Sequence, residues 1–405
     1  MAWDLRTEAL VVGAGPAGGM AALELARRGI GVVVVDRSPF PRDKVCGDGL
    51  LEASLGILGA AGLEPVLQRR VHRLDRVRFS APDGREFLLD GSFATLRRRE
   101  LDGLLVEEAC RAGAQFVDGI RVTEPLLQGD ACVGVKGVDR SGRFLTVAAK
   151  IILLATGANA RMLAAFGVLE EKRPTAYGIR GYFRVPELGD EREMLIAYDR
   201  AFLPFYVWFF PMGGGVFNVG WGMRPDGRGG IPKDKCPAPL MRRSPRVATI
   251  MAGSSQESPL RAAPMRTGFR GARSSAAGLL VLGEALGLSF PFLGEGIGNA
   301  LISGRLAAQV AARALRAGDV SLSSLCEYER ELRALLYPRH QGYLAAERWF
   351  RWSWVPNLVI SRAAGSPALG RLTGEILRGR RGAARIFSLQ GMLRLLLRRY
   401  GPWGG

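Results

Sequence analysis

The sequence has little histidine and little cysteine, and these shortages exclude several kinds of chemistry. Only His72 and His340 occur among 405 residues, so neither a histidine-rich metal centre nor a histidine-based triad is expected. The cysteines are scattered, with no CxxC pair and no metal-ligand spacing, which is typical of a reduced cytosolic protein without a structural metal. The five cysteines are Cys46, Cys110, Cys132, Cys236 and Cys326.

Long apolar runs are also missing. No stretch offers the roughly 18 uncharged apolar residues that a membrane-spanning helix needs. The first residues do not resemble a signal peptide, because a strand-like segment begins almost at once. We therefore expect a cytoplasmic location. With 48% hydrophobic residues and 54 glycines, the chain is typical of a turn-rich α/β protein whose large core divides into two or three substructures.

Acidic residues are in the minority, 38 against 56 basic ones, which gives a net charge of +18. The arginines are dispersed and no aromatic-basic module is present, so no nucleic-acid partner is expected. The densest basic region lies between Arg371 and Arg399. Two interpretations stay open for it: an amphipathic helix on an anionic membrane surface, or a last helix packed on the body with its arginines in water. Its apolar residues recur at helical spacing: Ile386, Leu389, Leu393, Leu396 and Leu397.

The first fifty residues carry the most informative pattern, a buried strand, a glycine turn, an alanine-rich helix and a second strand that ends in a carboxylate. Gly13 permits the tight turn, Gly15 lets the backbone approach a pyrophosphate, and Gly18 lets the helix pack on its strand. Asp36 follows at the distance, about 20 residues, at which an acidic side chain binds ribose hydroxyls. The sequence therefore predicts a dinucleotide site that comprises Gly13, Gly15, Pro16, Ala17, Gly18, Asp36 and Arg37.

Beyond this motif, strands and helices do not simply alternate. Hydrophobic periodicity and turn residues predict the following elements. They are two strands within 76–89, a helix at 101–112, a strand at 115–122, a hairpin at 133–147, a buried strand at 151–154, an aromatic strand-rich stretch at 177–222, a loop at 224–258, a strand at 279–284, a helix at 296–317 and a helical basic remainder.

Four further segments stand out in order along most of residues 8–330. They are PRDKVCGDG at 41–49, RRELD at 98–102, YVWFFP at 206–211 leading to NVG at 218–220, and GEA at 283–285 leading to PFLGEGI at 291–297. Together these segments resemble the geranylgeranyl reductase family of flavoproteins. The resemblance implies an α/β fold with three parts. These are a discontinuous Rossmann-like FAD-binding domain (1–75, 95–175 and 270–320), an antiparallel-sheet substrate domain (76–94 and 176–269) and a helical basic C-terminal region (321–405).

The resemblance also implies how FAD is held. Arg42 and Arg98 would lie near the pyrophosphate or ribityl chain, and Glu284 would bind ribityl hydroxyls where the family usually has Asp. The helix that opens near Gly296 would aim its positive N-terminus at the flavin and stabilise an anionic reduced ring. The other implied cofactor contacts are Cys46, Gly47, Gly157, Gly283, Pro291, Gly294, Glu295 and Ile297.

Two features bear on the substrate. Cys46 would lie close to the flavin and the substrate, where a thiol can donate a proton; a small buried hydrophobic residue is the alternative. Tyr206, Trp208 and Phe210 alternate as one face of a strand, with Phe205 and Phe209 on the other. Such a face either packs a sheet core or, with Pro211, forms an apolar tunnel for an isoprenoid or aromatic substrate.

The reaction implied by the resemblance is reduction of carbon–carbon double bonds in a prenyl lipid, quinone or diphosphate. Thr156 replaces an acid common in the superfamily, so NAD(P)H and a protein donor such as ferredoxin both stay open as the reductant. A monooxygenase is the main alternative; halogenation is disfavoured because no lysine, which a halogenase needs, occurs between Val45 and Val135. A quinone-linked dehydrogenase and a non-enzymatic FAD-binding protein also stay open.

Overall fold

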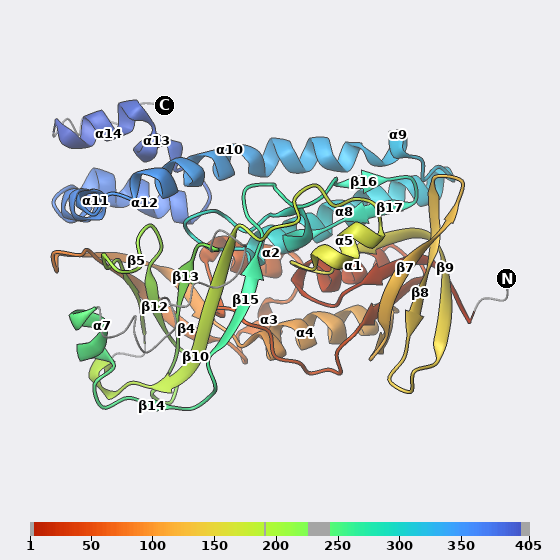
Figure 1. Cartoon of the computed structure of the whole chain (residues 1–405), viewed down its shortest axis with the longest axis horizontal. Helices are drawn as coiled ribbons and strands as arrows, with labels where there is room; N and C mark the ends of the chain where they lie inside the picture. Colours follow the sequence, from red (N-terminus) through yellow and green to blue (C-terminus); the bar gives the residue numbers. More distant parts are fainter. Residues whose placement is uncertain (1–3, 190–191, 226–243, 398–405) are drawn as a thin grey trace.

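The computed structural model describes residues 4–189, 192–225 and 244–397. Within these ranges the chain forms two sheets that lie at opposite ends of the long axis, with helices between them (Figure 1). A third part, made of C-terminal helices, runs along the top of the molecule in this view. The arrangement is the expected α/β architecture with a helical C-terminal region.

The first sheet is built on the glycine-turn motif. Strand β1 (Leu5–Val12) pairs in parallel with β2 (Val32–Asp36) and with β9 (Phe144–Leu154). The four valines of β2 are buried, as expected for a parallel strand covered on both faces. The strand order is β16-β17-β9-β1-β2-β6, and a β7-β8 hairpin extends from β9. The other strands are β6 (Gln115–Asp118), β7 (Arg121–Gln128), β8 (Ala131–Val138), β16 (Ser275–Ala276) and β17 (Leu279–Val281).

Helix α1 (Pro16–Ala26) is the central helix of this half. All of its residues are buried, because α4 (Arg98–Arg111) and α8 (Ile297–Ala317) both pack against it. Its alanines and glycines leave room for that close approach. The smaller helices nearby are α2 (Glu52–Ala60), α3 (Glu64–Leu67) and α5 (Ala160–Ala165).

The second sheet has the order β14-β10-β13-β12-β11-β4-β5-β3, with β15 beside β10. Most pairs are antiparallel, but β11 (Glu193–Ala197) pairs with β4 (His72–Ser80) in parallel, so the sheet is mixed rather than wholly antiparallel. The other strands are β3 (Gly49–Leu50), β5 (Glu86–Thr95), β10 (Ala176–Arg184), β12 (Val207–Pro211), β13 (Val216–Met223), β14 (Ser255–Gln256) and β15 (Arg261–Met265).

The C-terminal helices cover the second sheet. Phe79 and Phe87 of that sheet share a hydrophobic core with Phe350, Ile360 and Leu395. No helix among the described residues combines the length and apolar character required to cross a membrane. The helices are α9 (Leu322–Leu325), α10 (Glu327–Trp349), α11 (Trp354–Ala364), α12 (Pro367–Leu377), α13 (Ala384–Phe387) and α14 (Leu389–Leu396).

Several element boundaries differ from the sequence prediction. The expected strand 115–122 is broken at Gly119, whose φ of 76° is not a strand conformation. The expected strand 279–284 ends at Val281 and continues as a short 3₁₀ helix, η3 (Gly283–Leu286). The expected loop 224–258 contains α7 (Pro245–Ile250), capped by the Ser244 hydroxyl, which accepts the Val247 N–H. Residues 226–243 of that loop lie outside the described residues.

Candidate active site

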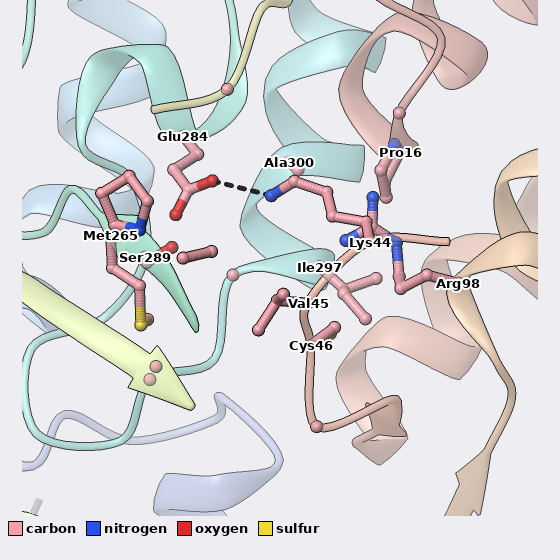
Figure 2. Close-up of a pocket in the computed structure, with 18 of the residues that line it drawn as sticks. Pro16, Lys44, Val45, Cys46, Arg98, Met265, Glu284, Ser289, Ile297 and Ala300 are labelled. Atoms are coloured by element: carbon pink, nitrogen blue, oxygen red, sulfur yellow. Dashed lines mark hydrogen bonds and ion pairs between the residues drawn. The ribbon is translucent and has the colours of Figure 1, made fainter. Parts of the chain in front are cut away.

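A cavity of about 680 Å³ lies between the two sheets, and Figure 2 shows part of its lining. This volume is in the range of small-molecule sites, roughly 300–1,000 Å³. Its walls come from the β1–α1 turn, the loop after β2, strands of the second sheet and the segment that leads into α8. The cavity therefore joins the dinucleotide motif to the aromatic strand.

The nucleotide turn has the local geometry that its glycines predict. Gly13 has a φ of +103°, and a Cβ on it would lie 2.4 Å from the carbonyl oxygen of Ala155. The N–H of Ala14 donates to Asp36 Oδ2 at 2.9 Å, and the N–H of Ser38 donates to Asp36 Oδ1 at 2.9 Å. These bonds fix the carboxylate against the turn, and its remaining lone pairs can accept ribose hydroxyls.

Two arginines face the same turn. Arg98 is buried and makes two hydrogen bonds of 2.8 Å to the buried Asp102, while Arg42 Nη1 reaches Asp102 Oδ2 at 2.9 Å. Burial alone would lower the pKa of Arg98, but the Asp102 carboxylate outweighs it and raises the pKa. A Cβ built on Gly15 would lie 3.5 Å from Arg98 Nη2 and 3.8 Å from Arg42 Nη2. Two fixed guanidinium groups therefore lie beside the N-terminus of α1, and together they form a strong anion-binding site.

An ion pair spans the cavity between the loop after β2 and the end of the first sheet. Lys44 Nζ lies 3.1 Å from Glu284 Oε2, as Figure 2 shows. Gly157 lies beside this carboxylate, because a Cβ on it would be 3.6 Å from Glu284 Oε2. Lys44 was not predicted as a site residue, although it belongs to the 41–49 segment. Its position in that segment was the available signal.

The segment before α8 also lines the cavity, as predicted for residues 291 and 294–297. Glu295 is engaged within its own helix end, since Glu295 Oε1 accepts the Gly298 N–H at 2.6 Å and the Ser54 hydroxyl at 3.4 Å. Burial raises the pKa of Glu295. Its backbone contributes to the cavity wall while its carboxyl caps α8.

Cys46 lies on the cavity wall and is half-buried. Its sulfur accepts the N–H of Asp48 at 3.3 Å. Burial and the Asp48 carboxylate raise the pKa of the Cys46 thiol, and Arg98 partly opposes them. A raised pKa keeps the thiol protonated at neutral pH, which makes it a poor nucleophile.

Asp48 is a fully buried carboxyl that the sequence prediction missed. It accepts the Tyr182 hydroxyl at 2.6 Å and the Asn218 amide at 2.9 Å. Burial raises the pKa of Asp48 to about 6, although these donors lower it. The same Asn218 amide donates to the Cys46 carbonyl at 2.8 Å, so the second sheet holds the cysteine loop in place. Polar residues in otherwise apolar strands were the signal for this network.

The predicted aromatic face does line the cavity. The ring centroids of Tyr206 and Trp208 are 6.2 Å apart, and those of Trp208 and Phe210 are 6.3 Å apart. Trp208 Nε1–H donates to Asn218 Oδ1 at 2.9 Å. Phe209 faces away from the cavity, as predicted, and is buried in a separate hydrophobic core within the second sheet. Phe205, which was predicted on that same face, lines the cavity instead, because β12 and its alternation begin only at Val207.

The structure brings nearly all predicted site residues to this one cavity. Gly18, Gly283 and Pro211 are the exceptions. Gly18 and Gly283 serve packing, since a Cβ on Gly18 would lie 1.9 Å from the Gly13 carbonyl oxygen and one on Gly283 would lie 2.9 Å from Ala17 Cβ. Pro211 accepts the Thr95 hydroxyl at its carbonyl. Apolar side chains not predicted as site residues extend the cavity: Val77, Phe79, Met194 and Ile196.

The residues present fit a flavin dinucleotide. The buried hydroxyl of Thr156, on the cavity wall, has no hydrogen-bond partner within the described protein. Buried polar groups are nearly always hydrogen-bonded, so a polar ligand beside Thr156 would satisfy it. An anion site at one end, carboxylates at two positions and an apolar far wall match pyrophosphate, sugar hydroxyls and a ring system in turn.

Comparisons with known proteins agree with this geometry. Residues 6–201 match the family described as FAD binding domain. The chain is 33% identical over 330 residues to menaquinone reductase of Mycolicibacterium smegmatis, and this alignment covers 76% of each protein. It is 30% identical over 332 residues to digeranylgeranylglycerophospholipid reductase 2 of Methanopyrus kandleri, which covers 80% of this chain and 81% of that protein.

Solved structures share the fold. A geranylgeranyl bacteriochlorophyll reductase-like protein from Thermoplasma acidophilum has a TM-score of 0.79 at 20% identity and covers 98% of this chain and 97% of its own. A myxobacterial chondrochloren halogenase, an FAD-dependent enzyme, has a TM-score of 0.74 at 23% identity and covers 86% of this chain and 84% of its own. At these identities the likeness shows the fold alone.

Proposed function

The chain belongs to the geranylgeranyl reductase family of FAD-dependent oxidoreductases, and on that premise we propose that it reduces carbon–carbon double bonds in the prenyl chain of a lipid or quinone. The relatives named above are reductases of menaquinone and of a digeranylgeranyl lipid. One observation carries the proposal: the dinucleotide turn, the protonated Cys46 thiol and an apolar aromatic wall share one cavity.

The chain's residues divide the work of holding FAD. In this proposal Asp36 would hold the adenosine ribose, Arg42 and Arg98 the pyrophosphate, and Glu284 with Lys44 the ribityl hydroxyls; their positions on one cavity support it. When bound, reduced FAD supplies a hydride to one carbon of the alkene. The N-terminus of α8 adds a positive dipole at the cavity wall, which favours an anionic partner there.

Alkene reduction also needs a proton for the second carbon. We assign that donation to Cys46, whose thiol keeps its proton through neutral pH because burial and Asp48 raise its pKa. The S–H bond breaks, a new C–H bond forms, and water returns the proton to the thiolate. Asn218, through its bond to the Cys46 carbonyl, and Asp48, through its N–H, position the sulfur.

The wall opposite the nucleotide turn suits a prenyl chain. Tyr206, Trp208 and Phe210 line it, and apolar residues of β4 and β11 continue the apolar surface. Such a lining excludes water and imposes no penalty on a substrate without polar atoms. A cavity of this kind favours an isoprenoid over a charged metabolite.

The oxygen-using alternatives have less support. The halogenase likeness is one of fold, and the chain has no lysine between Val45 and Val135. Lys44, just before that stretch, is engaged by Glu284. We therefore retain a monooxygenase only as the outcome that the experiment below would reveal.

The electron donor is a separate part of the proposal. Thr156 offers a neutral hydroxyl where the superfamily commonly has an acid linked to NADPH use. We propose a protein donor such as ferredoxin rather than NAD(P)H. A prenyl lipid resides in a bilayer, so the enzyme must also approach a membrane surface to reach it.

Product analysis tests the reaction. FAD-loaded protein, reduced with dithionite without oxygen, would be mixed with a digeranylgeranyl phospholipid, which has no quinone ring that dithionite or flavin could reduce, and the lipid examined by mass spectrometry. We expect products heavier by two hydrogens per reduced bond. The fully saturated lipid serves as the control and should be unchanged. Unreacted alkene together with an oxygenated product, once oxygen is admitted, would refute the assignment.

A further inference from the structure

Helix α14 exposes an apolar face that nothing else in the described chain covers. Leu389 is 79% exposed, and three more leucines at the end of the described chain, Leu393, Leu396 and Leu397, are exposed by half or more. Isolated exposed leucines are ordinary, but a contiguous apolar patch marks an interaction site. We call this patch the leucine face; it consists of Leu389, Leu393, Leu396 and Leu397.

The leucine face belongs to a firmly held helix. Met392 and Leu395, on the opposite side of α14, are buried in the core shared by the C-terminal helices and the second sheet. Arg362 Nε of α11 donates to the Leu395 carbonyl at 3.2 Å. Figure 1 shows α14 at the upper left corner of the molecule, above α11. The fold therefore fixes α14 and presents its leucines to the outside.

The C-terminal segment that carries the leucine face is basic and has exposed aromatic residues. Residues 348–397 contain nine arginines, no lysine and one acidic residue, Glu375. Trp352 and Trp354 are exposed at the start of α11, the helix on which α14 packs. Exposed leucines in a segment rich in arginine, with exposed tryptophans on the adjoining helix, are typical of a surface that lies in the interface of an anionic bilayer.

The same group of helices forms part of the cavity wall. Glu347 of α10 and Leu377 of α12 line the cavity, and the indole N–H of Trp349 on α10 donates to the Phe387 carbonyl just before α14, at 2.9 Å. A surface that seats these helices on a membrane would hold the cavity close to the bilayer. The leucine face and the route to the cavity thus belong to one structural unit.

We propose that the leucine face docks the protein onto an anionic lipid bilayer, with the neighbouring arginines attracting the headgroups and the leucines entering the acyl boundary. The purpose of docking rests on the proposed function, because a prenyl substrate is delivered from the membrane. The docking itself does not, since it depends on the exposed leucines and the charge alone.

Vesicle flotation of the FAD-loaded full chain tests the proposal. The probes are vesicles of phosphatidylcholine with about a third phosphatidylglycerol, and vesicles of phosphatidylcholine alone. The variant Leu389→Gln/Leu393→Gln/Leu396→Gln keeps good helix-forming residues. The matched control Leu127→Gln/Phe144→Gln/Leu322→Gln removes three comparably exposed apolar side chains on β7, β9 and α9. Figure 1 shows these elements at the end of the molecule away from α14.

We expect the wild type and the control to bind the anionic vesicles. The α14 variant should bind them at least about tenfold more weakly. Salt should weaken binding of the wild type by screening the arginines. Equal binding by all three proteins would overturn the proposal. So would a wild-type dimer in solution that the α14 variant converts to a monomer, because a second copy would then cover the leucines.

Activity separates this inference from the proposed reaction. The α14 variant should retain its flavin absorbance and should reduce a detergent-dispersed prenyl lipid at the wild-type rate. It should lose activity only toward the same lipid embedded in vesicles. Loss of both activities would point to damage in the cavity and would contradict a role confined to docking.

Discussion

At the scale of single residues, Cys46 and Asp48 are the two groups on the cavity wall to which the proposed proton donation is assigned or which position it. They lie two positions apart, joined by the bond from the Asp48 N–H to the sulfur, and both are held by groups from the second sheet. Their environment makes both of them poorer at carrying negative charge, because burial raises both pKa values. Each therefore has a measurable signature.

Replacing the thiol tests its role as proton donor. In Cys46→Ala, and equally in Cys46→Ser, alkene reduction should slow by about a hundredfold, the lower range for loss of a general acid. FAD affinity should change little, because the phosphate and ribose contacts are intact. Single-turnover reoxidation of the reduced protein by a prenyl lipid measures the effect. Cys110→Ala, at an exposed cysteine, is the control; a Cys46→Ala rate equal to that of the control would assign the proton to water.

Asp48 predicts a pH dependence of stability. Its folded pKa of about 6 lies above the ordinary value of 3.8, so its contribution to stability is present below about pH 4 and is lost as the pH rises through 6. Relative to Asp48→Asn, the wild-type free energy of unfolding should fall by about 3 kcal/mol between pH 3.5 and 7. Urea titrations across that range measure the difference.

Asp139→Asn is the control for this titration. Asp139 lies in an exposed turn, where the Ser141 hydroxyl lowers its pKa. A lowered pKa gives stability that is lost as the pH falls, so the wild type should gain relative to this variant as the pH rises. If the difference between wild type and Asp48→Asn did not vary with pH, the pKa of the buried carboxyl would be the same in the folded and the unfolded chain, which would contradict the raised pKa.

At the scale of elements, the N-terminus of α1 depends on open space above Gly15. Its φ of −81° suits any residue, and a methyl group at this position would meet only the heads of two arginines. Gly15→Ala should therefore fold normally but bind FAD at least about tenfold more weakly, because the methyl group projects where the pyrophosphate would lie. Flavin fluorescence titration of the apoprotein measures the affinity.

Gly56→Ala is the matched variant for the helix α2, since a Cβ there meets nothing within 4 Å. It should stabilise the fold by about 0.5–1 kcal/mol and leave FAD affinity unchanged. If Gly15→Ala bound FAD with wild-type affinity, the pyrophosphate would not bind at this turn. A Gly15→Ala protein that did not fold would show that the turn itself tolerates no side chain.

Elements with a strong local signal were predictable, and pairings over long distances were not. The valine run of β2 and the glycine turn before α1 indicated a parallel dinucleotide unit directly, because each signal lies within a few residues. The parallel pairing of β4 with β11 was missed, since periodicity identifies a strand but not its partner. The Lys44–Glu284 pair joins residues 240 positions apart, which no local pattern reveals.

The C-terminal tail shows the same limit. Helical spacing correctly indicated a helix, but the expected single run from Ile386 is broken at Ser388, whose extended backbone separates α13 from α14. Spacing alone did not say which leucines face the core. Packing against α11 decides that Leu395 is buried and that Leu393 is exposed.

At the scale of the whole molecule, the net charge of +18 bears on the electron donor. An acidic redox protein would be steered toward such a surface, and screening removes that attraction. The second-order rate of flavin reduction by a reduced acidic ferredoxin should therefore fall at least about tenfold between roughly 0.01 M and 0.3 M salt. Anaerobic stopped-flow spectroscopy measures it. Reduction by NADPH at the turnover rate would contradict the proposed donor.

The two sheets meet at the cavity, and electron transfer to a carbon skeleton is proposed to occur there. The most direct test is anaerobic reduction of the purified flavoprotein, followed by rapid mixing with a digeranylgeranyl phospholipid, which has no quinone ring, in one experiment and with oxygen in another. We predict that the lipid reoxidises the reduced flavin rapidly and that oxygen reoxidises it only slowly. Rapid reaction with oxygen through a flavin hydroperoxide absorbance, with no reoxidation by the alkene, would contradict the proposed reaction.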